Sequence, residues 1–370
     1  MSASSKLLSI LACAALVGAA CGSDSDDDSG SDATTTAASA APTAAGTDAV
    51  STSASDAPAS TAGTGSAPTM RLGWGFPGEE MKYVMIAKPE LFPNAGTCYE
   101  PEWQRFNGTA EQVQGMATGT LDGGTVAMLT FPRAIDQGVE LVLTNALIEE
   151  TRDGFSVQWT ARKGTTLEDL KGKKIATNAL GASLDYIVGV HLQEEAGLAF
   201  NQDYELVEVP FPQMGDALAT GLVDLAPLVQ PFYGIFSASE AAADFETLFT
   251  DVDILDPTPQ LQHGFTKSYV AEEPEAVKCF VEDLAKAAEF VLDPANRAEV
   301  VGVTSEVVEL PTEALDPYLL QPGRDFTRPQ GSALDVESLQ AAWDLFAEAG
   351  AIKTKHQVTD FLVDGISITE

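Results

Sequence analysis

KIATNALGASLDYIVGVHLQEEAG, residues 174–197, contains a strand, a turn and a helix in the order that determines the fold. The apolar run at 174–177 predicts a strand. Residues 183–196 predict an amphipathic helix, because their apolar side chains recur every three or four positions, and Gly197 is suited to end it. A further strand is predicted at 204–209. Strands that alternate with helices of this length indicate crossover units, a largely parallel sheet and the α/β class.

A six-residue repeat indicates that this unit occurs in two lobes. The sequence ATGTLD at 117–122 recurs as ATGLVD at 219–224. A helical pattern precedes each copy, and an apolar, strand-like run follows it, at 125–129 and at 225–229. Thr109 and Gln112 have the spacing of a capping box at the start of the first of these helices. We therefore expect two similar α/β lobes.

Residues that follow the predicted strands are the candidates for ligand binding. In open parallel sheets, ligands bind beyond the carboxyl ends of the strands, where turns and helix N-termini present free backbone donors. The turn at 181–183 suits an anion or a carbonyl oxygen, whereas the aromatic side chains in the other turns suit an apolar or planar ligand. The predicted ligand-binding residues are Trp74, Phe76, Thr130, Phe131, Gly181, Ala182, Ser183, Gln230 and Tyr233.

Several of these residues have a structural alternative. Phe76 and Phe131 also suit the hydrophobic core, and Ser183 suits the N-cap of its helix. Arg133 is the cation in these segments, and it fits either an anionic ligand or a surface position on a helix. The three histidines of the chain lack metal-ligand spacing, so we expect neither a metal site nor a cofactor.

The N-terminal residues indicate export. Residues 1–20 contain Lys6, an apolar run at 7–17 and small residues before Cys21, which are the parts of a secretory signal peptide. The run is shorter than the ~20 residues that a membrane-spanning helix needs. The sequence LVGAACGSD resembles a bacterial lipoprotein cleavage box, which predicts acylation of Cys21; an ordinary signal cut near Ala20 stays open. Residues 21–69 lack aromatic and basic side chains and predict a disordered linker.

Charge and cysteine content limit the partners and the compartment. A formal net charge of −35 argues against nucleic acid as a partner, because binding to phosphates needs clustered Lys and Arg. Residues 70–370 are enough for two lobes with substantial cores. They contain two cysteines, Cys98 and Cys279, which form either a disulfide or two free thiols in an oxidising compartment.

A resemblance to a known family supports the two-lobed interpretation. LEDLKGKKIA at 167–176, with GAS at 181–183 and EAGL at 195–198, resembles the substrate-binding proteins of ABC importers in the nitrate, sulfonate, taurine and thiamine-pyrimidine group. That group usually has an acid before the proline of the segment similar to 229–232, where this chain has Gln230. The resemblance implies a two-lobed periplasmic-binding-protein type II fold. Lobe one would be 70–156 plus 261–370, lobe two 157–260, and the ligand cleft would lie between them.

The sequence predicts an extracytoplasmic solute-binding lipoprotein of an ABC importer. We expect a monomer that captures a small anionic or heteroaromatic organic solute by closing its lobes and delivers it to a membrane permease. The lipid anchor at Cys21 would hold it on the outer face of the cell membrane. No enzymatic activity is expected, because nucleophile-elbow and zinc-protease motifs are missing. A ligand-sensing lipoprotein that presents solute to a receptor, and an exported enzyme on the same scaffold, stay open as alternatives.

Overall fold

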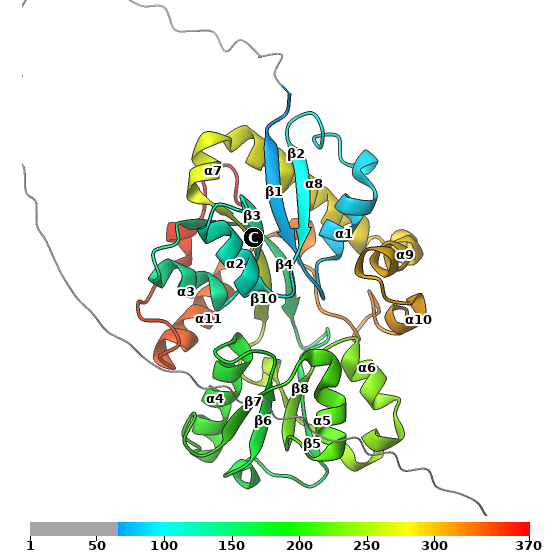
Figure 1. Cartoon of the computed structure of the whole chain (residues 1–370), viewed down its shortest axis with the longest axis vertical. Coiled ribbons are helices and arrows are strands. Elements are labelled where there is room, and N and C mark those ends of the chain that lie inside the picture. The colour runs from blue at the N-terminus through cyan, green and yellow to red at the C-terminus, as the bar shows by residue number, and fades with distance from the viewer. Residues whose placement is uncertain (1–65) are drawn as a thin grey trace, which may run out of the picture. The chain divides into compact units, whose positions relative to one another are not determined.

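The computed structural model describes residues 66–370, which form two five-stranded sheets, each flanked by helices (Figure 1). The predicted signal peptide, Cys21 and all but the last residues of the predicted linker lie outside the described residues. Within the described part of the chain, none of the helices has the length and apolar character needed to cross a bilayer.

The first sheet has the strand order β2-β1-β3-β10-β4, and together with its helices we call it lobe one. Strand β10 runs antiparallel to both β3 and β4, so the other four strands run in one direction. The strands are β1 (Thr69–Trp74), β2 (Glu100–Arg105), β3 (Gly123–Ala127), β4 (Leu141–Glu150) and β10 (Thr258–Thr266). The helices are α1 (Glu80–Ala87), α2 (Thr109–Ala117), α3 (Thr130–Asp136), α7 (Lys267–Glu272), α8 (Pro274–Leu292), α9 (Arg297–Val308), α10 (Thr312–Leu315) and α11 (Val336–Glu348).

The second sheet, which belongs to lobe two, repeats this arrangement with the order β7-β6-β8-β5-β9. Here β5 is the one strand that runs against the others. The strands are β5 (Gln158–Arg162), β6 (Lys174–Thr177), β7 (Glu205–Glu208), β8 (Leu225–Leu228) and β9 (Phe245–Thr250), and the helices are α4 (Ser183–Ala196), α5 (Met214–Thr220) and α6 (Phe232–Ser237). The reversed strands, β5 and β10, are those that the chain enters on crossing from one lobe to the other. The predicted α/β class and mostly parallel sheets are thereby confirmed.

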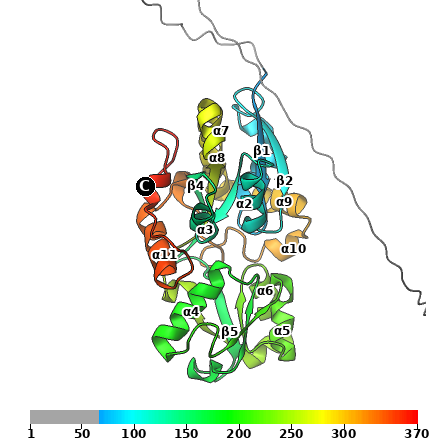
Figure 2. The same ribbon diagram turned by 60° about the vertical axis from the view of Figure 1, so that its left-hand side comes forward.

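Each sheet is covered by helices on both faces. In lobe one, α1, α8 and α9 pack on one face, and α2, α3 and α11 pack on the other (Figures 1 and 2). In lobe two, α4 covers one face, and α5 and α6 cover the other. Cys98 and Cys279 form a partly buried disulfide that joins the loop before β2 to α8 and packs against the core of lobe one.

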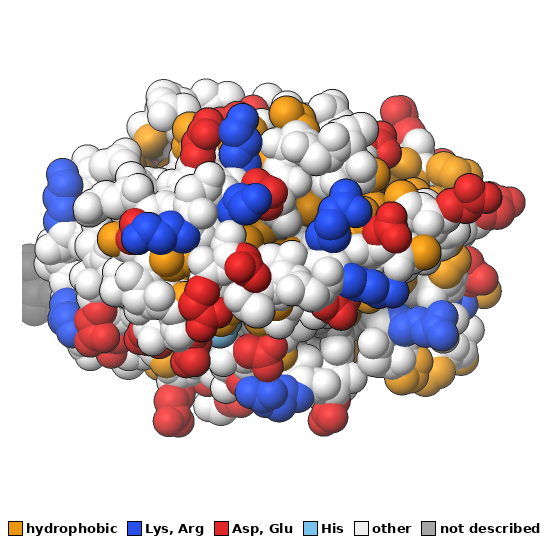
Figure 3. Space-filling view, turned by 90° about the horizontal axis from the view of Figure 1, so that it is seen from below, with side chains coloured by type: hydrophobic (Ala, Val, Ile, Leu, Met, Phe, Trp, Pro, Cys, Tyr) orange, Lys and Arg blue, Asp and Glu red, His pale blue; other side chains and the backbone are white. Residues whose placement is uncertain are grey.

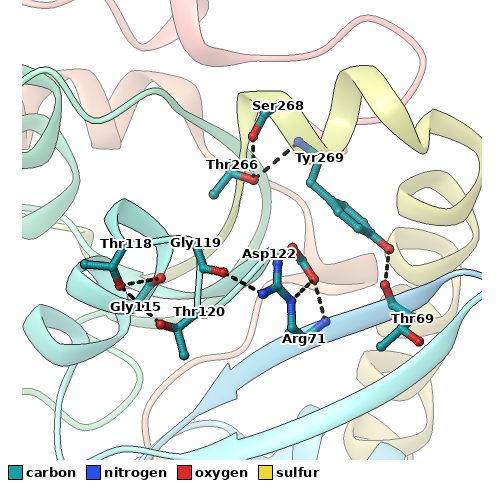
Figure 4. Close-up of polar contacts among 10 residues, drawn as sticks. All are labelled: Thr69, Arg71, Gly115, Thr118, Gly119, Thr120, Asp122, Thr266, Ser268 and Tyr269. Carbon is teal, nitrogen blue, oxygen red and sulfur yellow. Dashed lines mark hydrogen bonds and ion pairs between the residues drawn. The ribbon is translucent and has the colours of Figure 1, made fainter.

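The repeated turns have the same role in both lobes. In lobe one, the Arg71 amide donates to the Asp122 carboxylate at 2.8 Å, and the Asp122 amide donates to the Arg71 carbonyl at 2.8 Å. In lobe two, Lys174 and Asp224 form the same reciprocal pair, at 3.0 and 2.7 Å. Figure 4 shows the Arg71 side chain of β1 pointing at Asp122 and at the turn that contains Gly119. The aspartate of each repeat thus joins the turn to the start of the neighbouring strand.

Of the local features predicted from the sequence, one helix is confirmed and one capping box is not. The predicted helix at 183–196 coincides with α4, and Gly197 ends it with φ 66°. The predicted capping box is wrong, because α2 begins after Gly108 without a side-chain cap, and Gln112 instead accepts a hydrogen bond from the Thr125 amide at 2.7 Å. The predicted lobe boundary at 260/261 falls within β10.

On the face seen in Figure 3, acidic and basic side chains are interspersed, with no basic patch.

Candidate functional site

A cavity of about 200 Å³ lies where the carboxyl ends of the strands of both sheets face each other. The loops after β1, β2 and β3 and the end of β4 form its lobe-one wall. The loops after β6, β7 and β8 form its lobe-two wall. This is the position at which open α/β sheets bind ligands. The lining residues include Gly75, Phe76, Glu79, Asn107, Gly108, Thr109, Gln112, Thr130, Ile148, Glu150, Val157, Asn178, Ala182, Ser183, Leu184, Phe211, Val229, Gln260, Leu261 and Phe326.

The lobe-one wall contains a buried ion pair. Glu79 precedes α1, and its carboxylate lies 3.0 Å from the Lys82 ammonium. Lys82 is fully buried and also donates to the Gly73 carbonyl at 2.9 Å and to the Thr125 hydroxyl at 2.5 Å. Burial lowers the pKa of Lys82, while the nearby Glu79 carboxylate opposes that shift. All the donors of Lys82 therefore point at lobe-one groups, which leaves it unable to bind an anion in the cavity.

Gln112 places an unpaired donor at the same wall. Its Oε1 accepts from the Thr125 amide, which fixes the amide orientation, and its fully buried Nε2 has no hydrogen-bond partner among the residues that the structure describes. Gly75 lies between Gln112 and Glu79: a Cβ added there would lie 3.5 Å from Gln112 Nε2 and 3.3 Å from Glu79 Oε1. The absence of a side chain at Gly75 therefore keeps a buried donor and a buried acceptor open to the cavity.

The wall next to the crossovers contains a buried pair of acids. Glu150 ends β4 and accepts from the Ser156 hydroxyl at 2.5 Å, from the Val157 amide at 2.8 Å and from the Gln260 amide group at 2.5 Å. Asp251 lies beside it, 3.4 Å from the same Gln260 nitrogen. Burial, and then the Asp251 carboxylate, raise the pKa of Glu150 well above its usual range; burial raises the pKa of Asp251 to about 7. No basic side chain is hydrogen-bonded to either acid.

The lobe-two wall is apolar, apart from the start of α4 and Asn178. Phe211 and Val229 follow β7 and β8, and Leu184 extends from the first turn of α4. Ala182 and Ser183 stand at the helix start, where backbone N–H groups lack intrahelical acceptors. The neighbouring Gly181 amide is already bonded to the Asp185 carboxylate at 2.6 Å.

Phe326 reaches the cavity on a segment that a buried ion network holds in place. Arg328 donates to the Glu80 carboxylate at 2.7 and 3.0 Å and lies 2.8 Å from Asp325. All three side chains are buried. Because breaking a buried pair leaves an uncompensated charge, this network fixes the 325–328 segment against the start of α1. The aromatic ring of Phe326 is thereby held at the cavity and packs edge-on against Phe155.

Comparison with known proteins identifies the family. The sequence model described as the NMT1-like family matches residues 63–305. The chain belongs to the NMT1-like family. Among curated protein sequences, none matches it.

Solved structures share the fold of this NMT1-like chain. The aliphatic sulphonate-binding protein SsuA from Escherichia coli has a TM-score of 0.62 and 17% identity, with 82% of this chain and 94% of that chain covered. The alkanesulfonate-binding protein SsuA from Xanthomonas axonopodis pv. citri bound to MOPS has a TM-score of 0.61 and 16% identity, with 81% of this chain and 99% of that chain covered. The nitrate-binding protein NrtA from Synechocystis PCC 6803 has a TM-score of 0.60 and 12% identity, with 80% of this chain and 84% of that chain covered. These likenesses confirm the resemblance that the sequence indicated.

Four of the nine predicted ligand-binding residues line the cavity: Phe76, Thr130, Ala182 and Ser183. Phe76 follows β1, and Thr130 begins α3 with its hydroxyl accepting from the Ala127 amide at 2.8 Å. Ala182 and Ser183 come from the opposite lobe. The structure therefore brings residues from three of the four predicted turns together at one cavity.

The other five predicted residues lie elsewhere. Trp74 is buried against Tyr83 in the lobe-one core, and Phe131 is fully buried against Trp343 and Phe361. Neither ring lines the cavity, because both are held by core neighbours. The Gly181 carbonyl faces Arg133 rather than the cavity, while Gln230 and Tyr233 line a separate pocket against the 313–324 segment, with Gln230 Nε2 bonded to the Arg324 carbonyl at 3.1 Å.

Arg133, which the sequence offered as a partner for an anionic ligand, instead connects the lobes. Its guanidinium donates to the Ala351 carbonyl of lobe one at 2.9 Å, to the Tyr186 hydroxyl of lobe two at 2.7 Å and to the Gly181 carbonyl. It is not among the residues that line the cavity. Of the two alternatives for Arg133, pairing with an anionic ligand in the cavity is therefore not what the described residues show.

Sequence reasoning missed Glu79, Gln112, Glu150 and Gln260. Glu149 and Glu150 end the apolar run of β4, so an acid at the end of a buried strand was the available signal for one of them. Gln112 was assigned to a helix cap, and its true partner lies across a turn in β3. Within residues 66–370, no group of three or more His, Cys, Asp or Glu side chains is placed to hold a metal ion.

Proposed function

We propose that this NMT1-like chain is an extracytoplasmic solute-binding lipoprotein of an ABC importer, which captures a small organic molecule by closing its lobes and delivers it to a membrane permease without making or breaking a bond. The observation that carries the proposal is one cavity lined from both sheets, in a body whose lobes are joined by the two crossovers at 151–157 and 251–257. Such pairs of lobes close like a hinge around ligand. Family membership and the fold shared with periplasmic binding proteins support it.

Ligand-linked stability and compaction test the proposal. A solute that binds the folded chain at 100 times its Kd adds ~2.7 kcal/mol to the unfolding free energy and raises the melting temperature. Lobe closure also lowers the radius of gyration measured by small-angle scattering. We expect both changes with at least one member of a panel of small organic cations, neutral heterocycles and anions. If no member of the panel produces either change, the proposal fails.

A matched pair of glycine variants controls that test. Gly75→Val places side-chain atoms against Glu79 and the Phe106 carbonyl, both 3.3 Å from the added Cβ, and fills part of the cavity. Gly302→Val in α9 adds the same atoms where nothing lies within 4 Å. We expect Gly75→Val to abolish the ligand-induced shift and Gly302→Val to preserve it. Loss of the shift in both variants would contradict binding in this cavity.

Lipid attachment is tested separately, because Cys21 lies outside the described residues. Cells that express the full chain and are supplied with a labelled fatty acid should incorporate the label. We expect Cys21→Ser to abolish incorporation and Cys13→Ser, in the apolar run of the signal peptide, to retain it. Label that persists in Cys21→Ser would show that the anchor is elsewhere.

Labelled solute uptake, compared between cells with and without the chain, tests delivery to the permease.

A further inference from the structure

The charged side chains that line the cavity are both acids. Glu79 belongs to lobe one, and Glu150 belongs to the wall beside the crossovers. Among residues 66–370, no Lys, Arg or His lines the cavity. The nearest ammonium described above, that of Lys82, is committed to Glu79, Gly73 and Thr125. Because the Lys82 charge is already paired with Glu79, an anion in the cavity would find no cation among the described residues to pair with, which is unfavourable at the low effective dielectric of a buried site.

Glu150 and Asp251 form a pair of buried acids that has no countercharge within the part of the chain that the structure describes. Both side chains are fully buried, and their hydrogen-bond donors are the neutral groups of Ser156, Val157, Gln260 and Trp159. Arg152 is the cation at the crossover, but its exposed guanidinium pairs with Asp253 and Asp256. Two such acids tend to share a proton, because ionising both is unfavourable. A cation in the adjacent cavity would supply the missing charge.

The remaining surface of the cavity defines the rest of the ligand. Phe76, Phe211 and Phe326 offer aromatic faces, which attract cations as well as apolar groups. The buried, unpaired Nε2 of Gln112 is a hydrogen-bond donor. It would be satisfied by an acceptor on the ligand, such as a carbonyl, hydroxyl or ring nitrogen. The cavity thus combines acids, aromatic rings and one unused donor.

We infer that the solute is an organic cation, a small molecule with a protonated nitrogen and an apolar body and without negative charge, and that the Glu150–Asp251 pair supplies its countercharge. This inference rests on the proposed function and narrows it to one class of solute. It replaces the expectation of an anionic ligand. It also sets this cavity apart from the sulfonate-binding and nitrate-binding proteins that share its fold, whose ligands carry negative charge.

Three ligands of matched shape test the inference directly. Benzamidine, benzamide and benzoate share one ring and differ in charge, from positive through neutral to negative. Isothermal titration calorimetry of the purified full chain should give an affinity for benzamidine at least tenfold above that for benzamide, with benzoate weakest. Choline and benzylamine extend the cation arm, and nitrate, ethanesulfonate and MOPS extend the anion arm. Preference for neutral or anionic members overturns the inference and leaves solute binding standing, whereas no binding at all defeats the proposed function as well.

Variants of the acid pair separate charge from shape. Glu150→Gln keeps the size of the side chain and removes its charge, so we expect benzamidine affinity to fall at least tenfold while benzamide affinity changes less than threefold. Glu149→Gln is the matched control: burial raises the pKa of Glu149 to about 7, yet its side chain lies outside the cavity lining. We expect it to leave benzamidine affinity unchanged. Equal losses in the two variants, or equal losses for both ligands in Glu150→Gln, overturn the role of the pair.

The pH dependence provides a readout that a purely structural role would not change. Burial raises the pKa of Asp251 to about 7 and the pKa of Glu150 well above its usual range, so the pair is less protonated at pH 8 than at pH 6 and benzamidine affinity should increase severalfold between them. Benzamidine stays protonated across this range. Asp251→Asn removes the neighbour that raises the pKa of Glu150 and should move the profile to lower pH. A flat profile in the unmodified chain, or one unmoved by Asp251→Asn, contradicts the inference.

Discussion

Lobe one and lobe two share a strand order and a turn sequence, but they secure the turn with different side chains. Asp122 is buried and accepts from the Arg71 amide, from Nε at 2.9 Å and from Nη2 at 2.5 Å, while another guanidinium nitrogen binds the Gly119 carbonyl. Asp224 is exposed, and its side-chain partner is the Lys173 ammonium at 3.5 Å. The same backbone motif is therefore reinforced by a forked, partly buried ion pair in one lobe and by a solvated one in the other.

The two walls of the cavity differ in a similar way. Lobe one presents Glu79 and Gln112, and the crossover wall presents Glu150, whereas lobe two presents mainly apolar side chains and the start of α4. Under the proposed function, this division would assign recognition of the solute to lobe one and the crossovers. Lobe two would then cover the solute and exclude water. The difference between the lobes can be tested by changing equivalent positions in pairs.

The largest effect is expected at the aspartates of the repeated turns. Asp122→Ala removes the acceptor of three N–H groups and leaves the Arg71 amide of β1 without its side-chain partner, so the unfolding free energy should fall by about 3 kcal/mol. Asp224→Ala should lower the unfolding free energy by less than about 1 kcal/mol, because the partners of Asp224 can form hydrogen bonds to water instead. Urea denaturation of both variants measures the difference. Equal losses would mean that the backbone motif, rather than the side-chain environment, determines the stability of the turn.

An intermediate effect is expected at the cavity walls. Gln112→Met removes the unpaired donor, while Phe211→Leu trims apolar surface on the opposite wall. Solute affinity should fall about thirtyfold for Gln112→Met, equivalent to about 2 kcal/mol, and about fivefold for Phe211→Leu. Calorimetric titration with the tightest solute of the panel measures both. Because Gln112→Met also deprives the Thr125 amide of its acceptor, the melting temperature of each free variant must be recorded alongside. A larger loss for Phe211→Leu would reverse the assigned roles of the lobes.

Much of the fold was predictable because its signals are local. The helix α4 has the bounds that periodicity predicts, and the repeated turns located β3 and β8 to within a few residues. The position of β10 between β3 and β4 was not predictable from the sequence pattern. It depends on how the chain returns to lobe one after the second crossover, and that is set by packing between segments distant in sequence.

The site was less predictable, because burial at the cleft depends on distant partners. Phe131 follows a strand end, as a ligand-binding aromatic residue would, but Trp343 and Phe361 enclose it more than 200 residues later in the chain. Glu150 follows Glu149 with no sequence feature that distinguishes them. Only the crossovers place one at the cavity with Asp251 and leave the other outside it. Local patterns identify the turns that form the cleft, but they do not identify which side chains face it.

The smallest effect is expected at the contact that joins the lobes. Arg133 binds three acceptors and lies 5.0 Å from the centre of the Tyr186 ring, and a lysine cannot reproduce that planar set of donors. Arg133→Lys should weaken the closed state by about 1 kcal/mol, which raises the solute Kd about fivefold through faster dissociation. Arg162→Lys is the matched control, since Arg162 covers the Phe245 ring and pairs with Asp244 wholly within lobe two. Stopped-flow dissociation rates that change equally in both variants would show that Arg133 stabilises its own lobe instead of the closed pair, and the difference between the lobes would then lie in their walls alone.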